Sequence, residues 1–120
     1  GPDAWVRFLP PVAPKQVFEY LRGIDLLCCP SVALEGGPTV ALEAMAVGTP
    51  VIATHMTAMA EIVRDRVNGR LLPPGDWRAL AQAFRDILQD RSTLDRWRAA
   101  LPPVRTMDDV AQDSLRMYGA

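Results

Sequence analysis

Two almost wholly apolar runs, residues 24–30 (IDLLCCP) and 50–54 (PVIAT), constrain the fold of this chain most strongly. A strand with one face in water alternates polar and apolar side chains, whereas a strand covered on both faces is nearly continuously apolar. Between the two runs, residues 38–47 form a helical pattern that Gly48 ends. The order strand, helix, strand predicts parallel strands joined by right-handed crossovers.

The same alternation extends along the rest of the chain. Further strands are expected at residues 5–9 and within residues 67–76. Helical patterns cover residues 14–23, 58–65, 77–90, 92–100 and 107–118. Four short strands form a thin sheet, and the glycine-rich strand–turn–helix that opens a doubly wound domain is not found in this sequence. We therefore predict an α/β fold, the C-terminal half of a Rossmann-like domain, with a parallel sheet, helices on both faces and C-terminal helices.

Residues 77–90 form a strongly amphipathic segment. Asp76 is placed to cap its first turn, because a carboxylate at this position accepts a hydrogen bond from an N–H group of that turn. The expected apolar stripe comprises Leu80, Phe84, Ile87 and Leu88. The spacing of the aromatic residues also predicts core or helix-packing positions for Trp77, Phe84 and Trp97.

Charge and cysteine content exclude several classes of function. The formal net charge of −1 gives no general attraction to nucleic acid, so no nucleic-acid partner is expected. No apolar run approaches the roughly 20 residues that a membrane-spanning helix needs, and the N-terminus lacks the pattern of a signal peptide. Adjacent Cys28 and Cys29 would point to opposite faces of a strand and are expected to act as small hydrophobic residues in a reducing compartment. We expect one cytoplasmic domain, without a metal.

The segment Glu35-Gly36-Gly37-Pro38-Thr39 lies where the first apolar run passes into the helical pattern. Ligands of parallel α/β sheets bind at this position, against helix N-termini. The two glycines allow the backbone to approach a ligand closely. The N–H groups of Gly37, Thr39 and Val40 would point at an anion, assisted by the helix dipole. The segment therefore predicts a phosphate site.

Two carboxylates bracket this phosphate site. Like charges repel, so Glu35 and Glu43 are expected to accept hydrogen bonds from hydroxyl groups on either side of the phosphate rather than to contact it. Glu43 lies about 7 Å along the helix axis, a distance that matches a ribose attached to the phosphate. A nucleotide sugar has this arrangement of hydroxyls. The alternative for both acids is a solvent-exposed position without a ligand.

The string EGGPTVALEAMAVGTPVIA contains the two glutamates as an E-x7-E pair. Two glutamates eight apart match this pattern by chance on any helix, but the accompanying residues make the pattern specific. These residues are Pro30-Ser31, Glu61-Ile62-Val63, Asn68-Gly69, Pro74-Gly75-Asp76 and, in the helix that follows, Leu80-Ala81. Together they resemble the C-terminal, donor-binding domain of a GT-B glycosyltransferase of retaining family 4, in the glycosyl transferases group 1. The resemblance runs from about Val6 to Tyr118.

The resemblance implies roles for individual residues. Glu35 and its adjoining backbone would hold the transferred sugar, which makes Glu35 the candidate catalytic residue. Glu43 would accept hydrogen bonds from the ribose hydroxyls. The loop at residues 9–12 would lie near the nucleobase. Backbone amides serving the sugar and the diphosphate would belong to Gly36, Gly37, Thr39 and Val40. The resemblance implies no metal and no cofactor beyond the nucleotide diphosphate sugar, which is the substrate.

In proteins of this resemblance, an acceptor-binding domain and the Arg and Lys residues that neutralise the diphosphate belong to a preceding segment. Residues 1–120 are therefore expected to be a partial nucleotide-sugar-binding domain, inactive alone. Its expected partners are the nucleotide-sugar donor and the missing N-terminal acceptor domain. Any peripheral membrane contact is expected to occur only through that missing domain. Self-association of the fragment, through its N-terminal edge or by exchange of helix 107–118, is a further hypothesis.

The resemblance predicts the donor-binding part of a retaining glycosyltransferase, which moves a sugar from a nucleotide diphosphate sugar to an acceptor. The sequence departs from the family pattern at Pro10, Gly37 and Thr57-Ala58. Pro10 is expected to change the geometry of the base loop, and Gly37 to give a looser sugar pocket. Two alternatives stay open at this stage. One is a non-catalytic nucleotide-sugar-binding module, and the other is a GT-B sugar-nucleotide epimerase.

Overall fold

The computed structural model describes residues 14–29 and 37–101. Its sheet contains β1 (Leu27–Cys29), β2 (Val51–Thr54) and β3 (Gly69–Leu72) in the order β1-β2-β3. Both pairings are parallel, with Leu27 opposite Val51 and Val51 opposite Gly69. The predicted α/β fold with a parallel sheet is confirmed. The strand expected at residues 5–9 and the helix expected at 107–118 lie outside the described residues.

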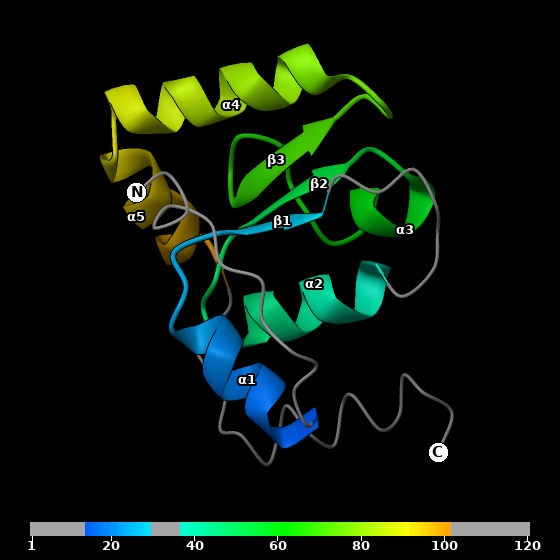
Figure 1. The fold of residues 1–120 in the computed structure, drawn as a ribbon, viewed down its shortest axis with the longest axis vertical. Helices are drawn as coiled ribbons and strands as arrows, with labels where there is room; N and C mark the ends of the chain where they lie inside the picture. Colours follow the sequence, from blue (N-terminus) through cyan, green and yellow to red (C-terminus); the bar gives the residue numbers. More distant parts are fainter. Residues whose placement is uncertain (1–13, 30–36, 102–120) are drawn as a thin grey trace, which may run out of the picture.

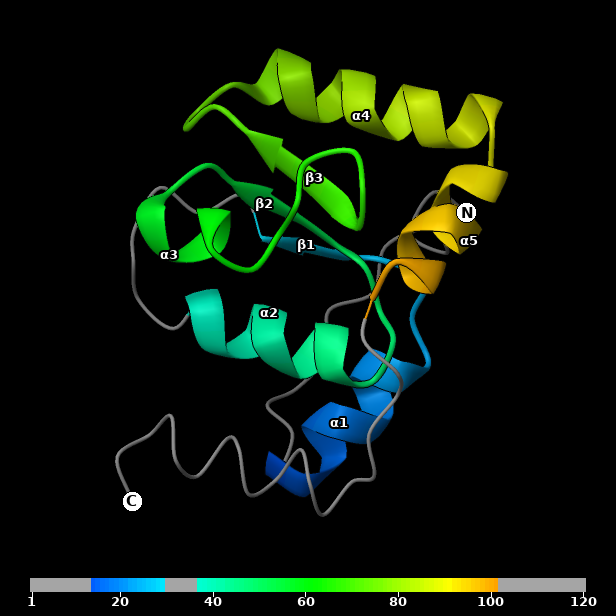
Figure 2. The same cartoon turned by 180° about the vertical axis from the view of Figure 1, so that it is seen from behind.

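Helices lie on both faces of this sheet (Figure 1). One face is covered by α1 (Pro14–Arg22) and α2 (Gly37–Ala46), and the other by α4 (Trp77–Gln89) and α5 (Ser92–Ala99). The short α3 (Thr57–Ala60) follows β2, and the view from behind in Figure 2 shows the same layers. The predicted helices in these regions are confirmed, and outside α3 their ends differ from the prediction by no more than one residue.

Alternating side chains of the strands build one core on each face of the sheet. Val51 and Ala53 pack with residues of α1 and α2, whereas Ile52 packs with residues of α4 and α5. Cys29 belongs to the first group and Cys28 to the second, so the two thiols point to opposite faces as predicted. Burial raises the pKa of the Cys28 thiol, and burial together with the neighbouring Cys28 raises the pKa of Cys29. Both side chains are half-buried and act as apolar packing groups.

The helix predicted at residues 58–65 is shorter than expected: α3 begins at Thr57 and ends at Ala60. The N–H group of Arg64 donates to Oδ1 of Asn68 (2.8 Å), instead of continuing the helix ladder to Ala60. The side chain of Asn68 is buried, and a buried amide is stable only when it is hydrogen-bonded. This bond turns the chain out of the helix and into β3.

The predicted cap of α4 is confirmed, but its predicted apolar stripe is wrong in part. Oδ1 of Asp76 accepts a hydrogen bond from the N–H group of Ala79 (3.0 Å). The side chains that pack on the sheet are those of Leu80, Ala83 and Ile87. Trp97 of α5 is buried as expected, whereas Trp77, Phe84 and Leu88 are exposed. The spacing identified the apolar residues correctly and assigned too many of them to the core.

Two hydrogen bonds tie together segments that are distant in the sequence. The hydroxyl of Thr49 donates to the carbonyl of Leu21, joining the end of α1 to the turn between α2 and β2. Nε of Arg98 on α5 donates to the carbonyl of Gly48 in the same turn (3.1 Å). Gly48 has φ of 90°, a conformation that glycine adopts without strain. The turn that leads into β2 is therefore held from both faces of the sheet.

The carboxylate of Asp65 holds the chain in place where β3 begins. Because it does so as an anion, its contribution to the free energy of unfolding should depend on pH. Its carboxylate accepts hydrogen bonds from the N–H group of Leu71 (2.9 Å) and Nε of Arg70 (2.8 Å). Partial burial opposes ionisation of Asp65, but the bonds from Leu71 and Arg70 outweigh it and hold the pKa below the usual 3.8. We expect Asp65→Asn to lower the free energy of unfolding at neutral pH by on the order of 1 kcal/mol, since the pair is partly exposed.

This difference between wild type and Asp65→Asn should shrink as the pH falls through the folded-state pKa, which lies below 3.8. Urea unfolding at a series of pH values measures it. Asp25→Asn, at an exposed position between α1 and β1, is the control and should change stability little at any pH. A difference between Asp65→Asn and wild type that stays constant into acid would contradict the role given to the Asp65 charge.

Candidate functional site

The candidate site lies at the carboxyl edge of the sheet. Because β1, β2 and β3 are parallel, their carboxyl ends meet at one edge, and the crossover helix α2 begins there (Figure 1). The helix α4 also begins at this edge, directly after β3. Ligands of open α/β sheets bind in this position, where helix N-termini present their N–H groups.

The first turn of α2 contains three of the predicted site residues. Gly37 is the first residue of this helix, and Thr39 and Val40 follow in the same turn. The first N–H groups of an α-helix have no acceptor within the helix, and Pro38 has none to offer. The available donors are therefore those of Gly37, Thr39 and Val40. Their part in binding stays a prediction.

Glu43 lies one turn further along α2 and is 8% exposed. Its neighbours Ala41, Ala44 and Met45 are also buried. A solvent-facing position for Glu43, the alternative left open by the sequence, is therefore wrong. Burial of a carboxylate costs free energy unless hydrogen-bond donors surround it, and glutamate side chains are therefore seldom buried. This burial makes Glu43 the strongest candidate among the described residues.

Glu35 and Gly36, the other two predicted site residues, lie outside the described residues, as does the loop at 9–12. The structure thus brings Gly37, Thr39, Val40 and Glu43 together on one helix and leaves the roles of Glu35 and Gly36 as predictions. His55 follows β2 at the same edge, where its N–H group donates to the carbonyl of Leu72 (2.7 Å) and its side chain is exposed. Within residues 14–29 and 37–101, no three His, Cys, Asp or Glu side chains gather as a metal site would require.

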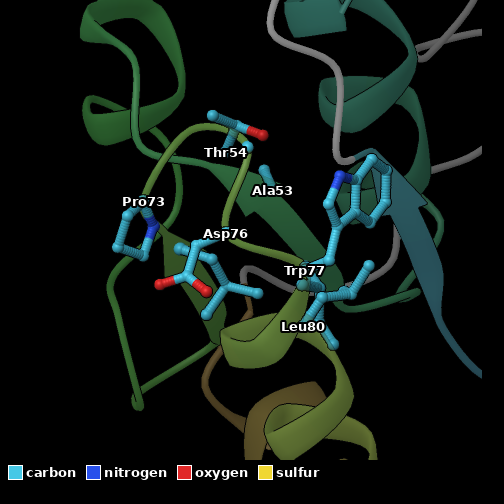
Figure 3. A pocket seen from close by; sticks show the side chains of 9 residues that line it. Ala53, Thr54, Pro73, Asp76, Trp77 and Leu80 are labelled. Carbon is cyan, nitrogen blue, oxygen red and sulfur yellow. The ribbon is translucent and has the colours of Figure 1, made fainter.

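A small open pocket adjoins this edge on the α4 side of the sheet (Figure 3). Residues of β2, the end of β3, the following loop and the start of α4 line it: Ile52, Ala53, Thr54, Leu72, Pro73, Gly75, Asp76, Trp77 and Leu80. Thr54 ends β2, and the indole of Trp77 stands at the rim. Pro74-Gly75-Asp76 indicates this loop in the sequence, whereas aromatic spacing predicts a core position for Trp77 and carries no signal for its place at this rim.

No helix among the described residues is both long enough and apolar enough to cross a membrane. A short parallel sheet with helices on both faces, and with helix N-termini at its carboxyl edge, places the chain in the class of doubly wound α/β domains. The chain belongs to the glycosyl transferases group 1 family, whose sequence model matches residues 2–101.

Named relatives support this family. The phosphatidyl-myo-inositol mannosyltransferase of Mycobacterium leprae is 36% identical over 116 residues, which is 94% of this chain and 31% of the relative. The D-inositol 3-phosphate glycosyltransferase of a Nocardioides species is 34% identical over 121 residues, or 98% of this chain and 26% of the relative. The chain therefore spans less than a third of the length of these two relatives.

A solved structure shows the same fold. Sucrose-phosphate synthase from Thermosynechococcus elongatus superposes with a TM-score of 0.64 and 29% sequence identity, over 95% of this chain and 29% of that protein. That sucrose-phosphate synthase is a GT-B glycosyltransferase, so the half-domain of the GT-B fold predicted for the present chain is confirmed.

Proposed function

We propose that this chain is the donor-binding part of a retaining glycosyltransferase, which moves a sugar from a nucleotide diphosphate sugar to an acceptor. The observation that carries the proposal is the burial of Glu43 in α2, close behind a helix N-terminus at the carboxyl edge of a parallel sheet, in a chain of this family. The N–H groups of Gly37, Thr39 and Val40, with Gly36 before them, bind the sugar and diphosphate. Glu43 accepts hydrogen bonds from the ribose hydroxyls, and Glu35 holds the transferred sugar.

This arrangement assigns the chain a positioning and electrostatic role in the reaction. The positive end of the α2 dipole favours the negative charge that develops on the leaving diphosphate. Glu43 fixes the ribose, so that the bond to be broken is held in place relative to the acceptor. We propose that no metal takes part and that the Arg and Lys residues beside the diphosphate come from another segment.

The relatives favour a donor role over an acceptor role. Their names differ in the acceptor or product: phosphatidyl-myo-inositol, D-inositol 3-phosphate and sucrose phosphate. Sugar transfer is stated in the names of the two relatives, and the solved structure has the GT-B fold. The matched segment is less than a third of each of the three proteins. We therefore propose that the acceptor site belongs to a further domain and that the half-buried, unbridged Cys28 and Cys29 reflect a cytoplasmic location.

The experiment that tests the proposal is Glu43→Gln in the protein at its natural length. The amide keeps the shape of the carboxylate but loses the charge that accepts from ribose hydroxyls. We expect binding of the preferred nucleoside diphosphate to weaken by about 1.5–3 kcal/mol, roughly 10- to 150-fold in Kd. Isothermal titration with a panel of nucleoside diphosphates measures the effect.

Inorganic pyrophosphate, which lacks a ribose, separates this role from a structural one. Its affinity should be unchanged by Glu43→Gln if the helix N-terminus is intact. Glu19→Gln, at an exposed position on α1, is the matched control and should leave both affinities unchanged. Equal binding of the nucleoside diphosphate by wild type and Glu43→Gln would refute the role of Glu43. Loss of pyrophosphate binding as well would show that the substitution acts on the helix rather than on the ribose.

A further inference from the structure

The turn that ends α2 lies at the amino edge of the sheet, opposite the candidate site (Figure 1). The N–H group of Thr49 donates to the carbonyl of Ala44 (2.8 Å), so the turn is bonded to the last part of α2 itself. The carbonyl of Pro50 accepts from the N–H group of Leu27, where β1 begins (3.0 Å). Together with the bonds from Thr49 to α1 and from Arg98 on α5, these contacts fix the turn to both helical layers and to the sheet.

The hydroxyl of Thr49 occupies a buried position, since this residue is only 1% exposed. A buried hydroxyl costs free energy unless it is hydrogen-bonded, whereas valine would fill the same space without that requirement. The hydroxyl donates to the carbonyl of Leu21, to which the N–H group of Ile24 makes a longer bond of 3.4 Å. A hydrogen bond is directional, so it forms well in one relative position of α1 and the turn. The bond therefore fixes where α2 ends relative to α1.

The helix α2 connects this turn to the candidate site. It is 10 residues long, which corresponds to about 15 Å, and its backbone hydrogen bonds make it move as one unit. Glu43 lies close to the turn, since its carbonyl accepts from the N–H group of Val47 (3.3 Å). The packing of α1 against α2 includes apolar side chains such as Phe18 and Ala41. Apolar contacts are not directional and allow packed helices to slide slightly, so the bond from Thr49 is what sets the register of the two helices.

We propose that Thr49 is a positioning residue for the donor site, where it sets the place of Glu43 and of the α2 N-terminus along the sheet. The inference rests on the function proposed above, because it concerns that same site. A ribose and a diphosphate held on α2 must also meet groups on other elements, and a displacement of about 1 Å can lower a rate about 100-fold. Arg98 has a weaker part, because its side chain is exposed and holds the same turn from the opposite face of the sheet.

Thr49→Val in the protein at its natural length tests the proposal. Valine has nearly the shape of threonine but cannot donate to Leu21. Isothermal titration with the diphosphates of adenosine, guanosine, cytidine and uridine first identifies the one that wild type binds most tightly. We expect Thr49→Val to raise the Kd of this nucleoside diphosphate at least about fivefold. Thr49→Ser keeps the hydroxyl and should return the Kd to within about twofold of wild type.

Ile52→Val is the control for a general loss of stability, because it shortens a buried side chain that packs on the opposite face of the sheet. Its Kd should stay within about twofold of wild type. If Thr49→Val does not fold, Arg98→Gln, at an exposed position on α5, breaks the other bond to the turn. It should raise the Kd at least about twofold, whereas Arg85→Gln, at an exposed position on α4, should not.

Amide hydrogen exchange measures the hold on α2 without any ligand. After correction for the global stability measured by urea unfolding, the amides of residues 44–49 should exchange at least about tenfold faster in Thr49→Val than in wild type. Thr49→Ser and Ile52→Val should differ from wild type by no more than about threefold. Unchanged exchange in Thr49→Val would show that the hydroxyl does not hold the turn, and it would overturn the inference.

The binding data distinguish a positioning role from a structural one. Faster exchange in Thr49→Val with an unchanged nucleoside diphosphate Kd would make Thr49 only structural and would overturn the inference. A Kd that Thr49→Ser does not restore would assign the effect to packing of the methyl group, with the same consequence. A wild-type protein that binds none of the four nucleoside diphosphates would instead refute the proposed function, and this inference with it.

Discussion

Gly69→Ala should leave the protein largely unfolded, with a loss of more than about 4 kcal/mol in the free energy of unfolding. Gly69 begins β3 opposite Val51 of β2. A Cβ atom at this position would lie 2.1 Å from the carbonyl oxygen of Val51, and 3.2 Å from both its carbonyl carbon and Cγ1 of Val63. Val51 is fully buried and pairs with a strand on each side, so its backbone cannot move away without breaking the sheet.

Circular dichroism and urea unfolding measure this loss. Gly23→Ala is the matched control, because a Cβ atom there meets only the carbonyl oxygens of Tyr20 and Glu19 at ordinary contact distances of 3.6 and 3.7 Å. The free energy of unfolding of the control should stay within about 1 kcal/mol of the wild-type value. A Gly69→Ala protein as stable as Gly23→Ala would show that β2 and β3 are not in contact at this point.

Ile52→Ala is expected to lower the free energy of unfolding by about 2–5 kcal/mol, the usual range for truncation of a buried aliphatic side chain. Ile52 is 1% exposed in the central strand, and its side chain packs with Leu72, Ala83, Ile87 and Trp97. Because these neighbours belong to β3, α4 and α5, a cavity at Ile52 would weaken every element on that face of the sheet.

Two further variants show whether the loss of stability comes from a cavity in the core or from any truncation of an aliphatic side chain. Ile52→Val removes one methylene group and should cost about 0.5–1.5 kcal/mol. Val67→Ala, where the side chain is 50% exposed, should change the free energy of unfolding by no more than about 0.5 kcal/mol. Urea titrations of the three variants measure the series. If Ile52→Ala costs no more than Val67→Ala, the packing of α4 and α5 on β2 is wrong.

The strands and most helices were predictable because their signals are local. The unbroken apolar runs located β1 and β2, and Asp76 located the start of α4. The early end of α3 was not predictable, because it depends on the side chain of Asn68 reaching back to Arg64. Nor could helical spacing show how much of the α4 surface is covered. Phe84 and Ile87 have equally apolar side chains, and only the position of the sheet distinguishes exposed Phe84 from buried Ile87.

The candidate site was predictable in its position and only partly in its geometry. The spacing of the glycines and Glu43 placed the site at the start of a helix, and α2 begins at Gly37. Burial of Glu43 could not follow from the spacing, since an acid on a helix is usually exposed. The rim position of Trp77 was missed because aromatic spacing does not show that the residue lies where β3 passes into α4.

The exclusively parallel pairing of the described strands has a consequence for how the chain folds. No hairpin links these strands, so β1 cannot meet β2 until a whole crossover has been closed. The two hydrogen bonds at the turn before β2 also join residues that are far apart in the sequence. Thr49 and Leu21 are separated by 28 residues, and Arg98 and Gly48 by 50 residues. Such contacts incur loop-closure entropy before they contribute stability, and they slow folding toward the millisecond-to-second range. Helices α2 and α4 can form as fluctuating local segments early, whereas the sheet assembles late and cooperatively around β2.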